Sequence, residues 1–140
     1  MGTAEPKKHV LDTSALLAYY QDEEGADQVA QILAEAARGE AIVYLSFMTI
    51  FEVAYLTTAT EGLDEAIRLV LQIRELNLEE VWPDETVLWH AAALKAREGM
   101  SVADAFIAGL AATTAATLVH RDPEFNKLAG EIKQLPLAGT

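Results

Sequence analysis

The sequence has 140 residues, of which 51% are hydrophobic, and its 22 acidic and 10 basic residues give a formal net charge of −12. This length and hydrophobicity predict a single domain with a substantial core over residues 1–140 and exclude a disordered chain. The absence of cysteine excludes disulfides, thiolate metal sites and cysteine nucleophiles. The excess of acids argues against a general nucleic-acid binder, because phosphate contacts require Lys and Arg.

The two ends of the chain, residues 1–6 and 137–140, are expected to be tails. Lys7 and Lys8 are not followed by an apolar segment, so we expect no signal peptide. Together with the lack of cysteine, this predicts a cytoplasmic protein. The weakly charged run from Gly99 to His120 contains Asp104 and three threonines, so a buried helix, a turn and a buried strand explain it better than a membrane span.

Strand patterns alternate with helical periodicity along the whole chain. The expected elements are strand 7–12, helix 15–20 capped by Thr13 and Ser14, helix 26–38, strand 41–45, helix 46–61, helix 63–76, strand 78–82, helix 84–98, helix 101–112, strand 116–119, helix 124–128 and strand 131–135. The strands are continuous apolar runs, which indicates burial on both faces. This pattern predicts an α/β fold, a three-layer α/β/α sandwich with a central, mostly parallel sheet of four to five strands.

Side chains at helical spacing should face the core in several of these helices. In helix 84–98 we expect Val87, Leu88, Ala91 and Leu94 to point inward.

Asp104 is the one formally charged residue between Glu98 and Arg121, and its neighbours are mostly Ala, Val, Ile, Leu and Phe. A helix that is apolar on all sides is expected to be buried. An isolated carboxylate in such a helix is strongly unfavourable unless it is paired, neutralised or bound to a cation. The run offers no Lys or Arg for pairing, so we interpret Asp104 as part of a metal site.

Three further acids are expected at the edge of the sheet where ligands bind in α/β proteins, beyond the carboxyl ends of the strands. Asp12 ends the first strand, Glu52 lies two turns into the helix after the second, and Asp122 follows strand 116–119. Clustered carboxylates repel one another, and a hard cation such as Mg²⁺ or Mn²⁺ relieves the repulsion. Such an ion can activate a water and stabilise charge on a phosphodiester. The predicted metal-binding and catalytic residues are Asp12, Glu52, Asp104 and Asp122.

Each of these acids also fits a purely structural role. The structural alternatives are capping boxes at Thr49–Glu52 and Ser101–Asp104, an N-cap at Asp122–Pro123, and an Asx turn or cap at Asp12. Capping and metal binding are compatible, because a carboxylate is favoured at a helix N-terminus.

Four short motifs surround these acids: Val-Leu-Asp12-Thr-Ser-Ala-Leu-Leu-Ala, Ser-Phe-Met-Thr-Ile-Phe-Glu52-Val, Asp104-Ala-Phe-Ile-Ala-Gly-Leu-Ala and Asp122-Pro-Glu-Phe. Their order and content resemble the PIN-domain family, especially the VapC-like toxins of toxin–antitoxin pairs. The resemblance extends from residue 9 to about residue 135. It implies a PIN-like fold and an endoribonuclease that depends on Mg²⁺ or Mn²⁺. It also implies a homodimer and an antitoxin protein as partner.

One position departs from the family pattern. The family commonly has Thr or Ser two places before its last acid, where this chain has His120. A neutral imidazole there can hydrogen-bond a metal-bound water or act as a base, and the alternative is a half-buried histidine at a strand end. Thr13 and Ser14 are expected to hydrogen-bond a carboxylate or a metal-bound water.

RNA binding has to rely on a few local cations, because even two divalent ions leave the chain strongly negative. The candidates nearest the acidic motifs are Arg97 and Arg121, with Lys95 and Lys127 beside them. We predict weak, salt-sensitive RNA binding.

Two other functions are open at this stage. A signalling receiver domain also places acids at strand ends, but it requires paired acids after the first strand and a lysine near the end. Here Asp12 is followed by Thr and Ser, and Lys133 is poorly placed. The second alternative is a PIN-like binding or regulatory module without nuclease activity, which fits the acidic composition and His120.

Overall fold

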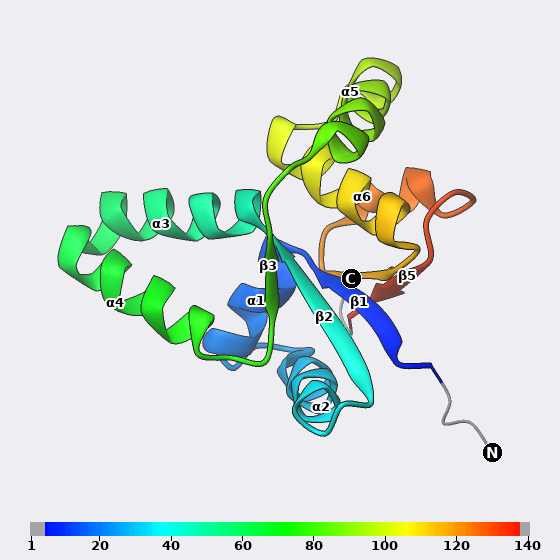
Figure 1. The fold of residues 1–140 in the computed structure, drawn as a ribbon. Coiled ribbons are helices and arrows are strands. Elements are labelled where there is room, and N and C mark those ends of the chain that lie inside the picture. Colours follow the sequence, from blue (N-terminus) through cyan, green and yellow to red (C-terminus); the bar gives the residue numbers. More distant parts are fainter. Residues whose placement is uncertain (1–4, 138–140) are drawn as a thin grey trace.

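A five-stranded sheet with all strands parallel forms the centre of the protein (Figure 1), whose computed structural model describes residues 5–137. The strands are β1 (Lys7–Leu11), β2 (Ala41–Ser46), β3 (Glu79–Val81), β4 (Thr117–His120) and β5 (Gln134–Pro136). Their order across the sheet is β3-β2-β1-β4-β5. The chain builds outward from β1 in one direction and then returns to the other side, so the switch in direction lies between β1 and β4. Open parallel sheets bind ligands at such a switch point, beyond the carboxyl ends of the strands.

The register brings the ends of the central strands level with one another. Leu11 pairs with Val119, and the next residue, Asp12, donates its N–H to the Val119 carbonyl at 3.0 Å. On the other side of β1, Val10 pairs with Tyr44 of β2. Residues that follow β1, β2 and β4 therefore meet at one edge of the sheet.

Helices cover both faces of the sheet (Figure 1). They are α1 (Thr13–Tyr20), α2 (Ala26–Ala37), α3 (Phe47–Glu61), α4 (Leu63–Arg74), α5 (Glu85–Glu98), α6 (Val102–Thr114) and the short 3₁₀ helix η1 (Pro123–Leu128). The α5–α6 pair lies on one face, and α1 and α2 lie on the other. The α3–α4 hairpin extends away from the sheet beside β3.

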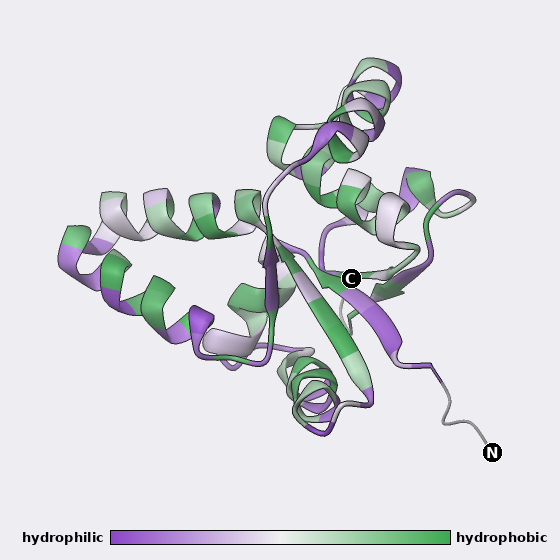
Figure 2. Cartoon of the chain, viewed as in Figure 1, coloured by the Kyte–Doolittle hydropathy of each residue, from purple (hydrophilic) through white to green (hydrophobic). Residues whose placement is uncertain are grey.

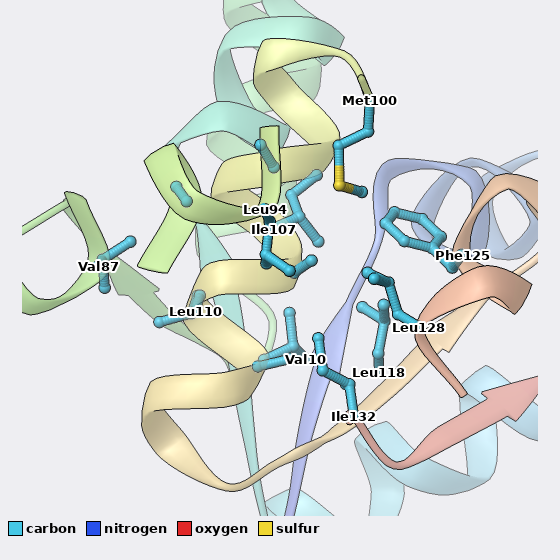
Figure 3. Close-up of a cluster of buried hydrophobic side chains, with 14 of the residues drawn as sticks. Val10, Val87, Leu94, Met100, Ile107, Leu110, Leu118, Phe125, Leu128 and Ile132 are labelled. Carbon is cyan, nitrogen blue, oxygen red and sulfur yellow. The ribbon is translucent and has the colours of Figure 1, made fainter. Parts of the chain in front are cut away.

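Two hydrophobic clusters fill the space between these layers. The first joins α5, α6 and η1 to β1 and β4, and Figure 3 shows Phe125 and Leu128 of η1 beside Leu118. The second joins α1, α2, α3 and α4 to the opposite face of the sheet. Successive strand residues supply both clusters, with Val10 in the first and Leu11 in the second. Strands that are buried on both faces explain why they appear as continuous apolar runs, such as the largely hydrophobic β2 in Figure 2.

The predicted fold class is confirmed, and most of the expected elements are present. The run from Gly99 to His120 forms helix α6, a turn and strand β4. Within residues 5–137, no helix combines the length and the apolar character that crossing a membrane requires.

Several local expectations are wrong. Asp12, not Thr13 or Ser14, is the N-cap of α1, and Ser46 caps α3, so Thr49 and Glu52 form no capping box. Leu88 is 39% exposed instead of facing the core, because α5 packs against α6 through the face that carries Ala91.

The predicted C-terminal tail needs a correction at its first residue. Leu137 is buried in the second hydrophobic cluster, and its N–H donates to the His120 carbonyl at 2.8 Å. The last strand, β5, also begins three residues later than the predicted strand 131–135. The remaining tail residues 1–4 and 138–140 lie outside the described residues.

Candidate active site

Asp12 is the most buried of the predicted acids. It follows directly on β1 and is only 3% exposed. Burial, together with the smaller effect of the Asp104 charge, raises the pKa of its carboxyl from the ordinary 3.8 to about 7, against the opposing effect of hydrogen bonds from Ser14. Among the described residues, no Lys or Arg forms a salt bridge with it. A buried carboxylate in this environment favours a bound proton or a cation.

Ser14 holds Asp12 and connects it to the end of β4. The Ser14 hydroxyl donates to Asp12 Oδ2 at 2.5 Å, and the Ser14 N–H donates to the same oxygen at 3.1 Å. The hydroxyl oxygen also accepts the backbone N–H of Arg121 at 2.9 Å. Ser14 therefore orients the carboxylate and ties the loop after β4 to the start of α1. The expected hydrogen bond from Ser14 to a carboxylate is present, and its role at a metal site stays a prediction.

Thr13 holds Glu52 in the same way. Its hydroxyl donates to Glu52 Oε1 at 2.6 Å, and its oxygen lies 3.2 Å from the Thr49 hydroxyl. Because Thr13 has one hydroxyl proton and the shorter bond is to the carboxylate, the Thr49 hydroxyl is the donor in the longer one. Thr49 is fully buried. Its role was not anticipated from the sequence, although it lies one helical turn before Glu52.

Asp104 lies in the first turn of α6, where the Ser101 hydroxyl accepts its backbone N–H at 3.1 Å. Its side chain is half-buried. Burial and, to a smaller extent, the charges of Asp122, Glu52 and Glu124 raise the pKa of Asp104 to about 6, against the opposing effect of the hydrogen bond with Ser101. The carboxylate of Asp104 is therefore the common electrostatic neighbour of the other acids, including Asp12.

Asp122 begins η1 as its N-cap, with Oδ1 accepting the Glu124 N–H at 2.9 Å. The predicted Asp122–Pro123 cap is thus present, and it coexists with the influence of Asp122 on Asp104. Glu124 is an acid that our sequence interpretation missed. Its position two residues after Asp122, in the first turn of η1, was the available signal. We call Asp12, Glu52, Asp104, Asp122 and Glu124 the acidic cluster.

His120 lies at the end of β4 and is completely buried, not half-buried. Its Nδ1 lies 3.1 Å from the backbone N–H of Asp122, and its Nε2 lies 2.8 Å from Gln134 Oε1. Both ring nitrogens are therefore occupied by partners inside the fold.

The acidic cluster has the chemistry of a hard-cation site. Its donors are all carboxylate oxygens, which Mg²⁺ and Mn²⁺ prefer. Burial and neighbouring negative charges raise the pKa values of Asp12 and Asp104 despite the hydrogen bonds that each receives. No group of three or more His, Asp or Glu side chains within residues 5–137 is arranged so that it could hold a metal ion. Instead, Ser14 and Thr13 hold Asp12 and Glu52 separately. The acids lie at one edge of the sheet and affect one another's charge, but their carboxylates do not converge on a single metal position.

The predicted RNA-binding cations are already engaged. Arg97 forms ion pairs with Glu98 and Glu131, whereas Arg121 has a single long contact of 3.8 Å with Glu23. The two lysines both donate to backbone carbonyls: Lys95 to that of Met100 and Lys127 to that of Glu98. Lys127 also pairs with Glu124 at 3.3 Å, whereas Lys95 forms no salt bridge within residues 5–137. Arg121 stands out by its position, because its backbone N–H is bound by Ser14 next to Asp12.

Several solved structures share this fold. DNA-bound VapBC from Salmonella typhimurium is 20% identical with a TM-score of 0.73, over 93% of this chain and 98% of that chain. VapBC2 from Rickettsia felis, bound to a promoter DNA fragment, is 17% identical with a TM-score of 0.72 over the same shares. Mycobacterium tuberculosis VapC20, described as a sarcin-ricin loop cleaving toxin, is 16% identical with a TM-score of 0.66, over 89% of this chain and 97% of that chain. At these identities the likeness concerns the fold.

The sequence itself gives a separate result. No curated protein matches the chain. Residues 9–131, however, match the PIN domain family. This match covers most of the chain and includes all four acidic motifs, so the chain belongs to the PIN-domain family.

Proposed function

We propose that this chain is an endoribonuclease that hydrolyses RNA phosphodiester bonds with a bound Mg²⁺ or Mn²⁺ ion, and that it is the toxin of a toxin–antitoxin pair acting in the cytoplasm. The observation that carries the proposal is Asp12, a buried carboxylate with no cationic partner among the described residues and a pKa raised to about 7. It lies beside other acids at the edge where parallel sheets bind ligands.

Four carboxylates would hold the ion: Asp12, Glu52, Asp104 and Asp122. A divalent ion bound there supplies an activated water and neutralises charge on the phosphate. The hydroxyls of Ser14 and Thr13 orient the carboxylates of Asp12 and Glu52 through hydrogen bonds of 2.5 and 2.6 Å. Supporting hydrogen bonds of this kind fix the direction of a ligand and raise metal affinity. Arg121 is the cation best placed to attract the RNA backbone at this edge.

The partners in this proposal are RNA, an antitoxin protein and a second copy of the chain. The Salmonella and Rickettsia structures, which are described as VapBC and share this fold, support the antitoxin. The Mycobacterium structure, described as a toxin that cleaves the sarcin-ricin loop, supports RNA as the substrate. Light scattering on the purified chain, alone and with a co-expressed antitoxin, tests the dimer and the complex.

Cleavage of a fluorescent RNA by chelator-treated protein, with Mn²⁺ or Mg²⁺ added back, tests the activity. We expect metal-dependent cleavage by the parent and a loss of at least about 100-fold for Asp104→Asn, since a ligand is removed. Asp64→Asn is the matched control, because Asp64 is exposed in the first turn of α4, at the far end of the α3–α4 hairpin (Figure 1). Its rate should stay within about twofold of the parent rate.

Two results would contradict the proposal. If Asp104→Asn protein cuts RNA as fast as the parent, the acidic cluster is not needed for cleavage in the way proposed. A well-folded parent that neither binds Mn²⁺ nor cuts RNA would instead favour a PIN-like binding or regulatory module.

A further inference from the structure

The ring of His120 lies in a hydrogen-bonded chain that runs from the acidic cluster into the core. The side chain is completely buried at the end of β4. Nδ1 lies 3.1 Å from the backbone nitrogen of Asp122, and Nε2 lies 2.8 Å from Gln134 Oε1 on the neighbouring strand β5. Gln134 Nε2 in turn donates to the Phe125 carbonyl in η1 at 2.7 Å. The chain of bonds therefore joins three elements that surround Asp122.

The partners fix where the protons are. A backbone N–H can only donate, so Nδ1 must be the unprotonated acceptor for Asp122. Nε2 therefore carries the proton and donates to Gln134 Oε1. The orientation of the Gln134 amide agrees with this, because its NH₂ group faces a carbonyl that can only accept. In this network the His120 ring carries its proton on Nε2, and every donor in the network faces an acceptor.

This ring anchors the loop that carries Asp122. The N–H of Arg121 is bound by the Ser14 hydroxyl, and the next N–H, that of Asp122, is bound by His120. Two consecutive amides after β4 are thus held, one by Ser14 and the other by His120. The Asp122 carboxylate then caps η1 through the Glu124 N–H. Both the backbone and the side chain of Asp122 have little freedom left to turn away from Asp104.

We propose that His120 is a positioning residue, which holds the Asp122 carboxylate in the direction required for the metal site, and that Gln134 and the Phe125 carbonyl keep its ring in the required tautomer. This inference rests on the proposed function, because it assumes that Asp122 is a metal ligand. It gives His120 no contact with RNA or metal, since both of its nitrogens are used within the fold.

Two substitutions test the hydrogen bonds of the two ring nitrogens separately. His120→Asn places an amide oxygen near the position of Nδ1, so the acceptor for the Asp122 N–H is kept and the bond to Gln134 is lost. His120→Gln reaches the position of Nε2, so the Gln134 bond is kept and the acceptor is lost. Phe125→Leu is the packing control, because the Phe125 ring lies 5.2 Å from the His120 ring without a polar contact to it.

The readouts are hydrogen exchange of the Asp122 amide in metal-free protein, Mn²⁺ affinity from the electron paramagnetic resonance signal of free Mn²⁺, and the separate kcat and KM for RNA. For His120→Gln we expect at least tenfold faster exchange, Mn²⁺ affinity lower by about 10- to 100-fold, and a lower kcat with little change in KM. His120→Asn should keep the slow exchange and most of the affinity. Phe125→Leu should lower the melting temperature and leave Mn²⁺ affinity nearly unchanged.

Equal losses in the Asn and Gln variants, or parent-like Mn²⁺ affinity in a folded Gln variant, would overturn the inference. If His120→Gln does not fold, Gln134→Met removes the support of Nε2, and parent-like exchange and Mn²⁺ affinity in that variant would overturn it equally. The proposed function fails separately, if the parent binds no Mn²⁺. Suppose that the parent and His120→Gln bind Mn²⁺ equally well and Asp104→Asn does not bind it. The proposed function then stands, and only the role of His120 is wrong.

Discussion

Asp12 and Asp104 form no salt bridge with a Lys or Arg among residues 5–137, whereas Glu124 of the acidic cluster pairs with Lys127 at 3.3 Å. Asp12 and Asp104 both have pKa values raised mainly by burial. The charge of Asp104 adds to the rise for Asp12, and the charges of Asp122, Glu52 and Glu124 add to the rise for Asp104. Ser14 offsets part of this for Asp12 with two hydrogen bonds. Buried carboxylates of this kind lower the stability of the metal-free protein near neutral pH. They also favour the binding of a cation, so stability is given up for a function, as is common at functional sites.

The pH dependence of stability tests this conflict. A carboxyl with a raised pKa binds its proton more tightly in the folded chain than in the unfolded chain. For Asp12, the stability that comes from this tighter proton binding is fully present below about pH 3.8 and is lost as the pH rises through about 7. We expect metal-free Asp12→Asn to be more stable than the parent at pH 8, by about 1–3 kcal/mol, and to show little difference at pH 4.

Urea denaturation in the presence of a chelator, at both pH values, measures the effect of Asp12→Asn. Adding Mn²⁺ at pH 8 should stabilise the parent and leave the variant unchanged. An Asp12→Asn protein that is less stable than the parent at pH 8 would show that the carboxylate has a favourable partner.

The starts of helices place the acids at this edge of the sheet. Helices α1, α3 and η1 directly follow β1, β2 and β4, whereas α6 follows helix α5. Asp12 caps α1 and Asp122 caps η1, while Ser101 binds the N–H of Asp104 in the first turn of α6. Under the proposed function, the same residues combine helix capping with metal binding. A helix N-terminus favours a negative charge and also fixes its direction.

Helix α6, which carries Asp104 in its first turn, packs very closely on α5 at Gly109. A Cβ atom added to Gly109 would lie 3.1 Å from the backbone nitrogen of Ala91 and 3.3 Å from the Ala91 Cβ. Backbone atoms of a packed helix cannot easily move away, so Gly109→Val should separate the two helices. We expect a loss of about 1–3 kcal/mol in the free energy of unfolding.

Thermal and urea denaturation measure this loss. Gly130→Val is the control, since a Cβ atom at Gly130 would have no neighbour within 4 Å. If Gly109→Val were as stable as the parent, the close α5–α6 contact would not be needed to hold Asp104.

The whole molecule is strongly acidic, and its net charge of −12 opposes the approach of RNA. Within residues 5–137, Arg97 and Lys127 form ion pairs with glutamates, Arg121 has only a long contact to Glu23, and Lys95 forms no ion pair. Attraction of RNA therefore depends on very few side chains. The predicted weak and salt-sensitive binding stays a prediction.

Arg121→Gln tests that dependence in an Asp104→Asn background, which prevents cleavage. Binding of a single-stranded RNA should weaken, and the slope of log affinity against log salt should become shallower by about 0.7, the value for one lost phosphate contact. Arg97→Gln is the control, because Glu98 and Glu131 already neutralise that guanidinium. Fluorescence anisotropy over a range of salt concentrations measures both slopes. Equal effects of the two substitutions would assign RNA attraction to the general surface charge.

Periodicity and capping patterns predicted the helices and strands well, because both depend on residues close together in the chain. The same patterns failed where packing between elements decides the outcome. Leu88 has helical spacing for the core, yet it is exposed because α5 presents another face to α6. Leu137 looked like part of a tail, yet it fills a gap in the second hydrophobic cluster.

The sequence by itself determined the α/β class, the acids that follow the strands and the apolar setting of Asp104, since these are local properties of the chain. Only the tertiary structure decided which groups hold those acids. Ser14 binds the Arg121 amide across 107 positions of sequence, and Thr13 binds Glu52 across 39. His120 finds Gln134 on the next strand. Hydrogen bonds depend on a few tenths of an ångström in space, and only the packed sheet and helices set distances of that size.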